Sequence, residues 1–178
     1  MLGGPGCSMK KVPRIAKILC ASLILGSLLV YSPPVDANWQ WTTWGMTLDQ
    51  IIAKSNGGVR TTTEGERESH SVGTKAQPEL KVALAYAPYT TGKYEFDAWF
   101  LFDPRKKSLV CVYLNLKDKM LGQALRQDLM AKYGRSENSE DFFGKASNWF
   151  TEDDRIIWQE TAVGYSVEYC SRASSSGL

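Results

Sequence analysis

The feature that most constrains the fold is a series of segments with the spacing of β-strands. Residues 80–86 and 94–102 place large apolar side chains at every second position, and Thr91-Gly92 leaves room only for a tight turn between them. Residues 108–116 are apolar on both faces, as in a central strand. Strands joined by short connections favour antiparallel pairing, so the sequence predicts a meander in the middle of the chain.

Two segments with helical spacing accompany this meander. Thr47 and Gln50 have the spacing of a capping box, and Met46 and Ile51 occupy the two positions of a hydrophobic staple. The spacing therefore predicts a short helix that begins after Thr47. A second helix is predicted over residues 118–133, where an apolar stripe runs along one side and a glycine follows.

Three further strand candidates, residues 148–151, 155–161 and 165–170, close the chain. The prediction is an α+β fold: a mainly antiparallel sheet of about six strands with two helices on one face, in the order α-βββ-α-βββ. This order hints at an internal repeat of a helix plus a meander. Residues 59–79 are polar and without periodicity and are expected to form a loop, and residues 172–178 a flexible tail.

The start of the chain predicts an export signal. A basic stretch without acids, residues 10–17, precedes an uncharged run over residues 18–31, and Val35-Asp36-Ala37 places small or branched residues where signal peptidase reads. We therefore predict cleavage of residues 1–37 and a single periplasmic or secreted domain of residues 38–178. Translation from Met9 would suit the signal better than translation from the first residue.

A membrane anchor is the alternative interpretation of the same run. A spanning helix needs about 20 apolar residues, and the paired prolines at 33–34 end this one well before that length. We therefore expect no stable membrane span after cleavage.

The charge balance excludes one large class of partner. The leader carries four of the 21 basic residues and one of the 19 acidic residues, which leaves 17 against 18 and a net charge of −1. Nucleic-acid binding depends on a concentrated positive field. We expect no nucleic-acid partner, and the favoured partner is another protein or an envelope component.

Two cysteines remain after the predicted cleavage, Cys111 and Cys170. In an exported chain such a pair predicts one disulfide. The alternative is two unpaired strand cysteines whose Cα atoms lie too far apart to be joined.

Catalytic and metal-binding patterns are scarce. The single histidine, His70, lies among Glu64, Glu66 and Glu68 in the polar segment, which is typical of a solvated surface rather than of a metal site. The motifs of nucleophile elbows, phosphate loops and dinucleotide sites are absent from the sequence. We predict no metal, no cofactor and no catalytic activity.

One catalytic alternative stays open, a small hydrolase that uses two carboxylates. The candidate pairs are Asp153 with Asp154, on one turn, and Glu160 with Glu168, on facing strands.

Tryptophans are the remaining functional lead, with six in the chain. Trp39 and Trp41, near the mature end, are expected to be partly exposed, and Trp99 is expected on the face opposite Phe96 and Phe100. We predict these three tryptophans as ligand or partner contacts. The alternative is that they simply pack in the core.

One local motif resembles a known group of proteins. Gly45-Met46-Thr47 followed by Gln50-Ile51 resembles the Gly-Met-Thr-x-x-Gln-Val opening of small exported bacterial proteins, which include the small lipoprotein of the outer-membrane β-barrel assembly machine and the β-lactamase-inhibitor-like fold. A later Tyr133-Gly134 is similar as well. The resemblance implies a compact α+β module that works by surface contact.

The sequence thus predicts a small exported, non-catalytic binding or protein-interaction module. A carboxylate-based hydrolase and an inhibitor or immunity-type protein are the alternatives.

Overall fold

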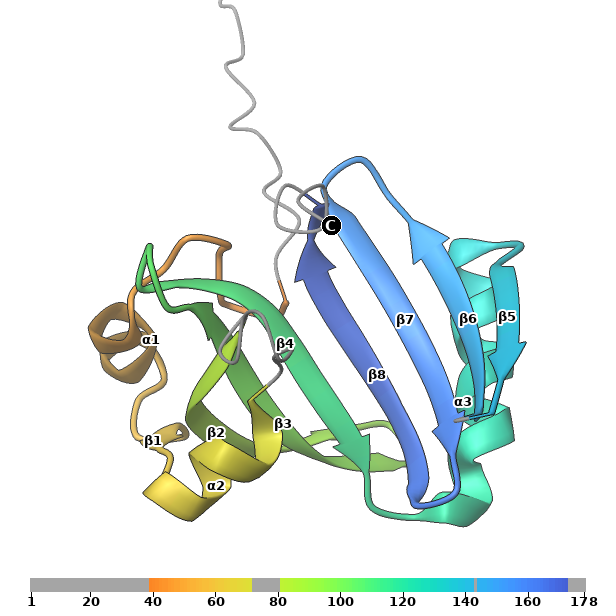
Figure 1. The fold of residues 1–178 in the computed structure, drawn as a ribbon, viewed down its shortest axis with the longest axis horizontal. Coiled ribbons are helices and arrows are strands. Elements are labelled where there is room, and N and C mark those ends of the chain that lie inside the picture. The colour runs from red at the N-terminus through yellow and green to blue at the C-terminus, as the bar shows by residue number, and fades with distance from the viewer. Residues whose placement is uncertain (1–38, 72–80, 143, 173–178) are drawn as a thin grey trace, which may run out of the picture. The chain divides into compact units, whose positions relative to one another are not determined.

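The computed structural model describes residues 39–71, 81–142 and 144–172 (Figure 1). The chain divides into two units, Met1–Pro33 and Pro34–Leu178, and every described residue belongs to the second. The predicted signal segment, residues 72–79 of the predicted loop, and residues 173–178 of the predicted tail lie outside the described residues.

An antiparallel sheet of eight strands in the order β1-β2-β3-β4-β8-β7-β6-β5 dominates the described structure (Figure 1). The α+β class and the antiparallel sheet are therefore confirmed. The strands are β1 (Arg60–Thr61), β2 (Val82–Thr91), β3 (Tyr94–Asp103), β4 (Ser108–Leu116), β5 (Glu137–Asp141), β6 (Gly144–Phe150), β7 (Asp154–Thr161) and β8 (Gly164–Ser171). The helices are α1 (Leu48–Lys54), α2 (Glu64–His70) and α3 (Gly122–Tyr133), with a 3₁₀ turn η1 (Lys119–Leu121) before α3.

The predicted number of elements, six strands and two helices, is wrong, because β1, β5 and α2 add to it. None of the three carries an apolar pattern. β1 has two residues, and β5 is the polar sequence ENSED at the edge of the sheet, where a strand needs no buried face. α2 buries none of its residues.

Helix α2 replaces part of the loop predicted over residues 59–79, and capping rather than burial explains it. The Thr63 hydroxyl accepts from the Glu66 backbone N–H, and the Glu66 carboxylate accepts from the Thr63 backbone N–H at 2.9 Å. Arg60 donates to both Glu66 oxygens, at 2.8 and 2.6 Å, and this pairing lowers the pKa of Glu66 to about 2. At its C-terminal end the ring of His70 stacks on Trp99, with 3.7 Å between ring centroids.

The capping box predicted for α1 is confirmed. The Gln50 side chain accepts from the Thr47 backbone N–H at 2.9 Å, while the Thr47 hydroxyl accepts from the Gln50 backbone N–H. The two residues of the predicted staple, Met46 and Ile51, are buried in the same apolar cluster. α1 therefore enters the core through its first turn.

The sheet consists of two similar halves. The meander β2-β3-β4 follows α1, the meander β6-β7-β8 follows α3, and the last strands of the two meanders, β4 and β8, pair at the centre. This arrangement agrees with the helix-plus-meander repeat hinted at by the sequence. No helix within the described residues is long and apolar enough to cross a membrane.

Both faces of the sheet carry buried side chains. The larger cluster lies on the face that α1 and α3 cover, and it includes Ile51, Leu125 and Leu129 from these helices. The two predicted helices, α1 and α3, therefore share one face as expected, and the additional helix α2 lies on the other. Figure 1 is viewed from the α2 side, with α3 behind β6.

The smaller cluster, on the α2 face, contains the predicted disulfide, which is confirmed. Cys111 and Cys170 are paired residues of β4 and β8, with their Cα atoms 4.0 Å apart. Both are buried. The bond therefore joins the two halves of the sheet at their only shared ladder in the described structure.

Removing this disulfide should destabilise the fold strongly. The bond closes a loop across a sequence separation of 59, so Cys111→Ala combined with Cys170→Ala should cost roughly 4 kcal/mol on the loop-entropy model. Urea unfolding of the variant and of the oxidised parent measures the difference. A variant as stable as the parent would contradict a structural role.

Close packing at the start of α3 generates a second prediction. A Cβ on Gly122 would lie 2.2 Å from the ring of Tyr165, and the Gly122 carbonyl accepts from the Trp158 indole at 3.2 Å. Gly122→Ala should therefore lower the stability by roughly 1–3 kcal/mol, or about 3–10 °C in Tm. Gly65→Ala, in a helix where a Cβ meets nothing within 4 Å, is the matched control and should leave the Tm unchanged or raise it.

Candidate functional site

The three tryptophans predicted as contacts do not form one surface. Trp39 is 8% exposed, Trp99 is 6% exposed, and Trp41 is 40% exposed. The expected exposure of Trp39 is wrong because its ring lies against Tyr89 and Phe100, with centroids 4.8 and 5.6 Å away. Trp99 belongs to the cluster on the opposite face, under His70.

The predicted carboxylate pairs also separate. Glu160 accepts from the Tyr165 hydroxyl at 3.1 Å on the α3 face, whereas Glu168 accepts from Lys81 at 2.7 Å on the α2 face. Because side chains alternate along a strand, the registers of β7 and β8 place these two acids on opposite faces. Asp153 is exposed, while its neighbour Asp154 is half-buried.

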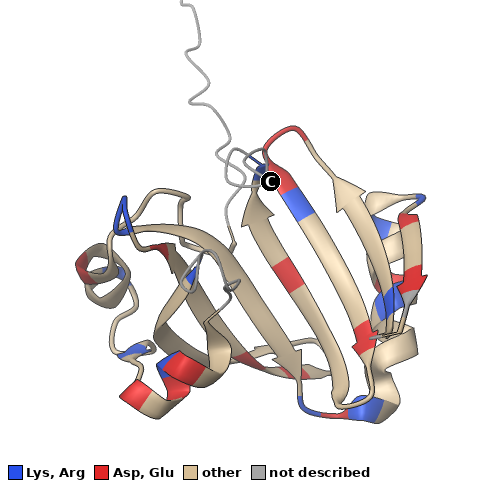
Figure 2. Cartoon of the chain, in the orientation of Figure 1, with Lys and Arg blue, Asp and Glu red and all other residues tan. Residues whose placement is uncertain are grey.

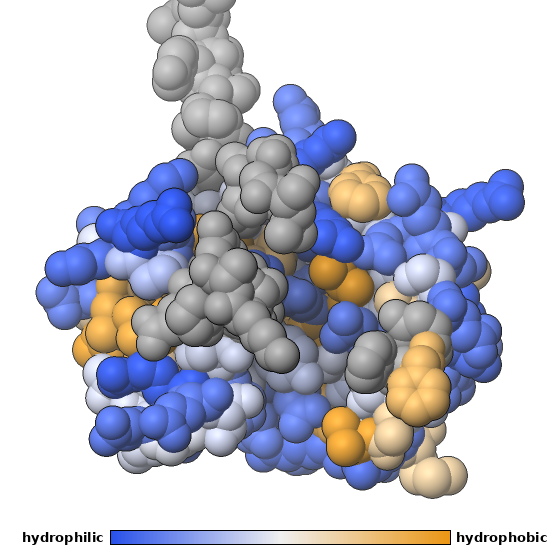
Figure 3. Space-filling model, in the orientation of Figure 1, coloured by the Kyte–Doolittle hydropathy of each residue, from blue (hydrophilic) through white to orange (hydrophobic). Residues whose placement is uncertain are grey.

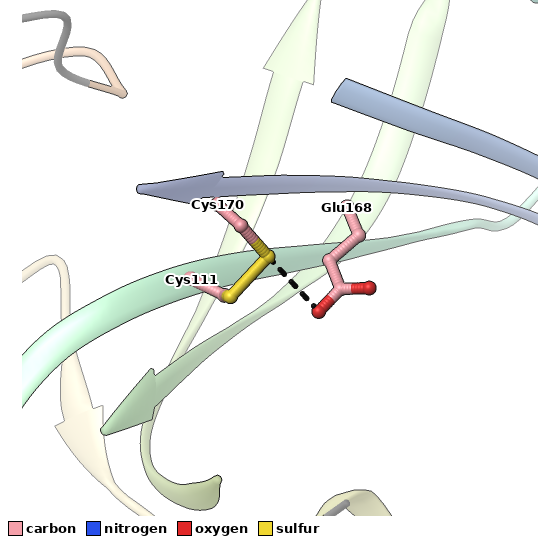
Figure 4. Close-up of side chains that lie close together, drawn as sticks. All are labelled: Cys111, Glu168 and Cys170. Atoms are coloured by element: carbon pink, nitrogen blue, oxygen red, sulfur yellow. Dashed lines mark hydrogen bonds between the residues drawn. A yellow bond between two sulfur atoms is a disulfide. The ribbon is translucent and has the colours of Figure 1, made fainter. Parts of the chain in front are cut away.

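A potential metal-ligand cluster is already occupied by covalent and ionic bonds. Atoms of Cys111, Cys170 and Glu168 lie within 4.8 Å of one another (Figure 4). The two sulfurs are bonded to each other, and Glu168 pairs with Lys81. Metal binding by cysteine needs free thiolates, so in this state the cluster is a structural disulfide beside an ion pair.

A cavity of about 430 Å³ lies on the face covered by α3, and its size falls within the range of small-molecule sites. Its walls come from the segment before α1, the β2–β3 hairpin and the C-terminal half of α3, and its floor from β4, β7 and β8. The lining residues are Trp39, Gln40, Trp44, Tyr89, Thr91, Gly92, Tyr94, Phe96, Leu114, Leu125, Asp128, Leu129, Lys132, Tyr133, Asp154, Val167 and Tyr169.

Two hydrogen bonds connect the walls of this cavity. The Tyr94 hydroxyl donates to Asp128 at 2.5 Å, which links β3 to α3. Gln40 donates to the Tyr89 hydroxyl at 2.6 Å, which links the segment before α1 to β2. Burial and the bond to Asp128 raise the pKa of Tyr94 to about 12. The hairpin is therefore fixed on both sides.

Asp154 lies at the floor, where β7 begins. The Trp44 indole donates to its Oδ1 at 2.7 Å. Burial nevertheless raises the pKa of Asp154, and the nearby negative charge of Asp153 raises this pKa further. No cation pairs with Asp154 among the described residues.

Three tyrosines line the cavity together with this carboxylate. Burial raises the pKa of Tyr169, and the neighbouring Tyr133, Tyr89 and Asp154 raise it further, so the four side chains lie close enough to interact electrostatically. Tyr89, Tyr133 and Tyr169 each remain partly exposed. The inner cavity thus combines aromatic rings with one carboxylate, and we call these four residues, together with Trp44, the aromatic site.

Charged residues of both signs are scattered over helices, turns and strands in the view of Figure 2. The view in Figure 3 is mostly hydrophilic, with small separate apolar areas. The most exposed apolar side chains, Met120, Phe142 and Val163, lie at turns and bring no polar group that would orient a ligand.

Comparisons with known proteins add no assignment. No family model matches the sequence, and no curated protein or solved structure matches it either. The resemblance of the Gly45–Gln50 region to small exported proteins therefore stays a prediction, and the functional argument depends on the cavity.

Sequence reasoning named Trp39 as a contact and Asp154 as one of a catalytic pair with Asp153, both for reasons other than this cavity, and it missed the tyrosines. A signal existed for Tyr169, because it has the same strand parity as the apolar Val167 and so faces the same side. Asp154 likewise has the same strand parity as the buried Ile156 and Trp158, so it faces the same side. Its hydrogen-bond partner Trp44 is far away in the sequence, and no spacing predicts that contact.

The Tyr94–Asp128 bond generates a prediction about alkaline stability. Tyr94→Phe should cost about 1 kcal/mol near neutral pH, because it removes one hydrogen bond to a partly exposed carboxylate. The raised pKa means that the folded state favours the neutral phenol. This stabilisation is complete below the ordinary tyrosine pKa near 10 and is lost as the pH rises through about 12.

The difference in stability between the parent and Tyr94→Phe should therefore shrink between about pH 10 and pH 12, as measured by urea unfolding across that range. Tyr113→Phe is the matched control, since Tyr113 lies on the α2 face and its hydroxyl has no hydrogen bond to the described residues. A difference that stays constant with pH would show that the hydroxyl–carboxylate contact does not form in solution.

Proposed function

We propose that the chain is a small exported, non-catalytic binding module that holds a small molecule in the cavity between α3 and the sheet. The single observation that carries this proposal is the aromatic site, in which partly exposed rings and an unneutralised carboxylate face a space of ligand size. Such a combination of apolar walls with a few polar groups is typical of ligand sites.

Two further observations support the proposal. The cavity walls are held by hydrogen bonds at Tyr89 and Tyr94, so the site is formed before a ligand arrives, which reduces the entropy cost of binding. The Cys111–Cys170 disulfide suits a protein that works in an oxidising compartment outside the cytosol.

The hydrolase alternative gains one specific observation. Asp128 and Asp154 both line the cavity, and a pair of carboxylates in one cleft is what glycoside hydrolysis requires. This pair differs from both pairs expected from the sequence. Asp128, however, already interacts with Tyr94 and Lys93, which favours a structural role for this carboxylate.

Binding in the cavity can be tested with three probes of different charge: choline, benzyl alcohol and benzoate. In NMR titrations, at least one of them should shift the indole N–H signals of Trp39 and Trp44 saturably. The Trp99 signal should not move, because that indole lies on the opposite face.

Two variants make the result specific to the cavity. Leu125→Phe adds volume to the lining and should weaken binding of the responding probe by about tenfold, since overpacking at such a site costs on the order of 1–3 kcal/mol. Trp41→Ala, outside the lining and 40% exposed, should leave binding unchanged. Absence of any saturable shift with all three probes would refute the proposed function.

A further inference from the structure

We propose that the cavity binds a small organic cation, an alkylated ammonium compound, whose charge lies between Asp154 and the rings of the aromatic site. This inference depends on the proposed function, because it names the ligand class of the same cavity.

The first argument is the charge balance of the lining. Two carboxylates line the cavity, and Asp128 has both a cation, with Lys93 Nζ 3.7 Å away, and the Tyr94 hydroxyl. Asp154 has only the neutral indole of Trp44 on Oδ1, and its Oδ2 accepts no hydrogen bond from the described residues. A half-buried carboxylate without a cation pays a desolvation penalty that an entering cation would remove.

The second argument is the aromatic composition around that charge. Trp44, Tyr89, Tyr133 and Tyr169 are all partly exposed and line the cavity together with Asp154. The faces of such rings attract cations, and the attraction is stronger where water is excluded. One ring already shows this behaviour, since the ammonium of Lys132 lies 4.9 Å from the centroid of Tyr133.

Other ligand classes fit these groups less well. Ca²⁺ takes about six to eight oxygen ligands and Mg²⁺ needs near-octahedral oxygen coordination, which one carboxylate among indole and phenol rings does not supply. An anion would be repelled by Asp154, and a neutral molecule would leave its charge unpaired. Lys132 also lines the cavity, but its side chain is exposed, so solvent and salt screen its repulsion.

The experiment compares choline with 3,3-dimethylbutan-1-ol, its neutral isostere, by calorimetry and by NMR of the Trp44 indole N–H. The two molecules have nearly the same shape, so a difference in affinity reports the charge. Choline should bind at least about tenfold more tightly, which corresponds to about 1.4 kcal/mol.

Asp154→Asn tests the residue that carries the argument. Asparagine keeps a side-chain oxygen to accept from Trp44 and removes the charge, so the preference for choline over its isostere should disappear. Asp153→Asn is the matched control, because the neighbouring acid is exposed and does not line the cavity, and it should retain the preference.

Stability distinguishes a ligand-binding carboxylate from a structural one. Because the folded-state pKa of Asp154 is raised, ionisation of this group weakens folding once the pH exceeds its unfolded value. Asp154→Asn should therefore have a higher Tm than the parent at neutral pH without ligand, and the gain should vanish at low pH. A merely structural carboxylate predicts a lower Tm for this variant.

The pH dependence of choline binding gives an independent readout. Affinity should fall as the pH drops through the raised pKa of Asp154, and Asp154→Asn should lack this step. The groups that act on Asp154 are the neutral indole of Trp44, the phenol of Tyr169 and the neighbouring carboxylate of Asp153. Asp128 and Lys132 also line the cavity, so the variant is needed to assign the step.

Equal affinities for choline and its isostere, or unchanged choline binding by Asp154→Asn, would overturn this inference. The proposed function would survive that result if benzyl alcohol or benzoate binds in the cavity. If none of these molecules binds, both proposals fail together.

Discussion

The pairing of β4 with β8 is the interaction on which the rest of the structure depends. Five residue pairs, from Cys111↔Cys170 to Asn115↔Ser166, are the only ladder that joins the two halves of the described sheet. The same ladder serves both faces. On the α2 side it carries the disulfide, and on the α3 side Leu114, Val167 and Tyr169 form the cavity floor. A change in register by one residue would exchange these faces, so the disulfide also fixes which side chains reach the cavity.

The proposed role of the aromatic site brings stability and function into conflict. A chain selected for stability alone would neutralise Asp154 with a cation or replace it, because burial makes its charged form unfavourable. Asp128, on the opposite wall of the cavity, has Tyr94 and Lys93 as partners, as expected for an acid with a structural role. The contrast supports a ligand role for Asp154, since the more exposed acid has a cation partner and the more buried one has none among the described residues.

The sequence predicted the elements whose pattern is local and missed those that depend on distant contacts. The Thr47–Gln50 capping box, the central meander and the disulfide follow from spacing, strand periodicity and the number of cysteines left after the predicted cleavage. α2 and β5 were not predicted because few of their side chains are buried. Hydrophobic periodicity detects only segments that bury one face. The site escaped for another reason. The proposed ligand-binding role of Asp154 depends on its contacts with Trp44 and Tyr169. The spacing of these three residues along the chain does not indicate that they lie close together.

The close contact of α3 with the sheet and the cavity lie towards opposite ends of this helix. At the N-terminal end, Gly122 lets the helix approach so closely that a Cβ there would lie 2.2 Å from the Tyr165 ring, and the Trp158 indole donates to the Gly122 carbonyl. Towards the other end, Asp128 and Tyr133 line the cavity together with Tyr94 and Tyr169. Because rigid elements form its walls, the cavity is a consequence of packing that persists without a ligand, as a preorganised site requires.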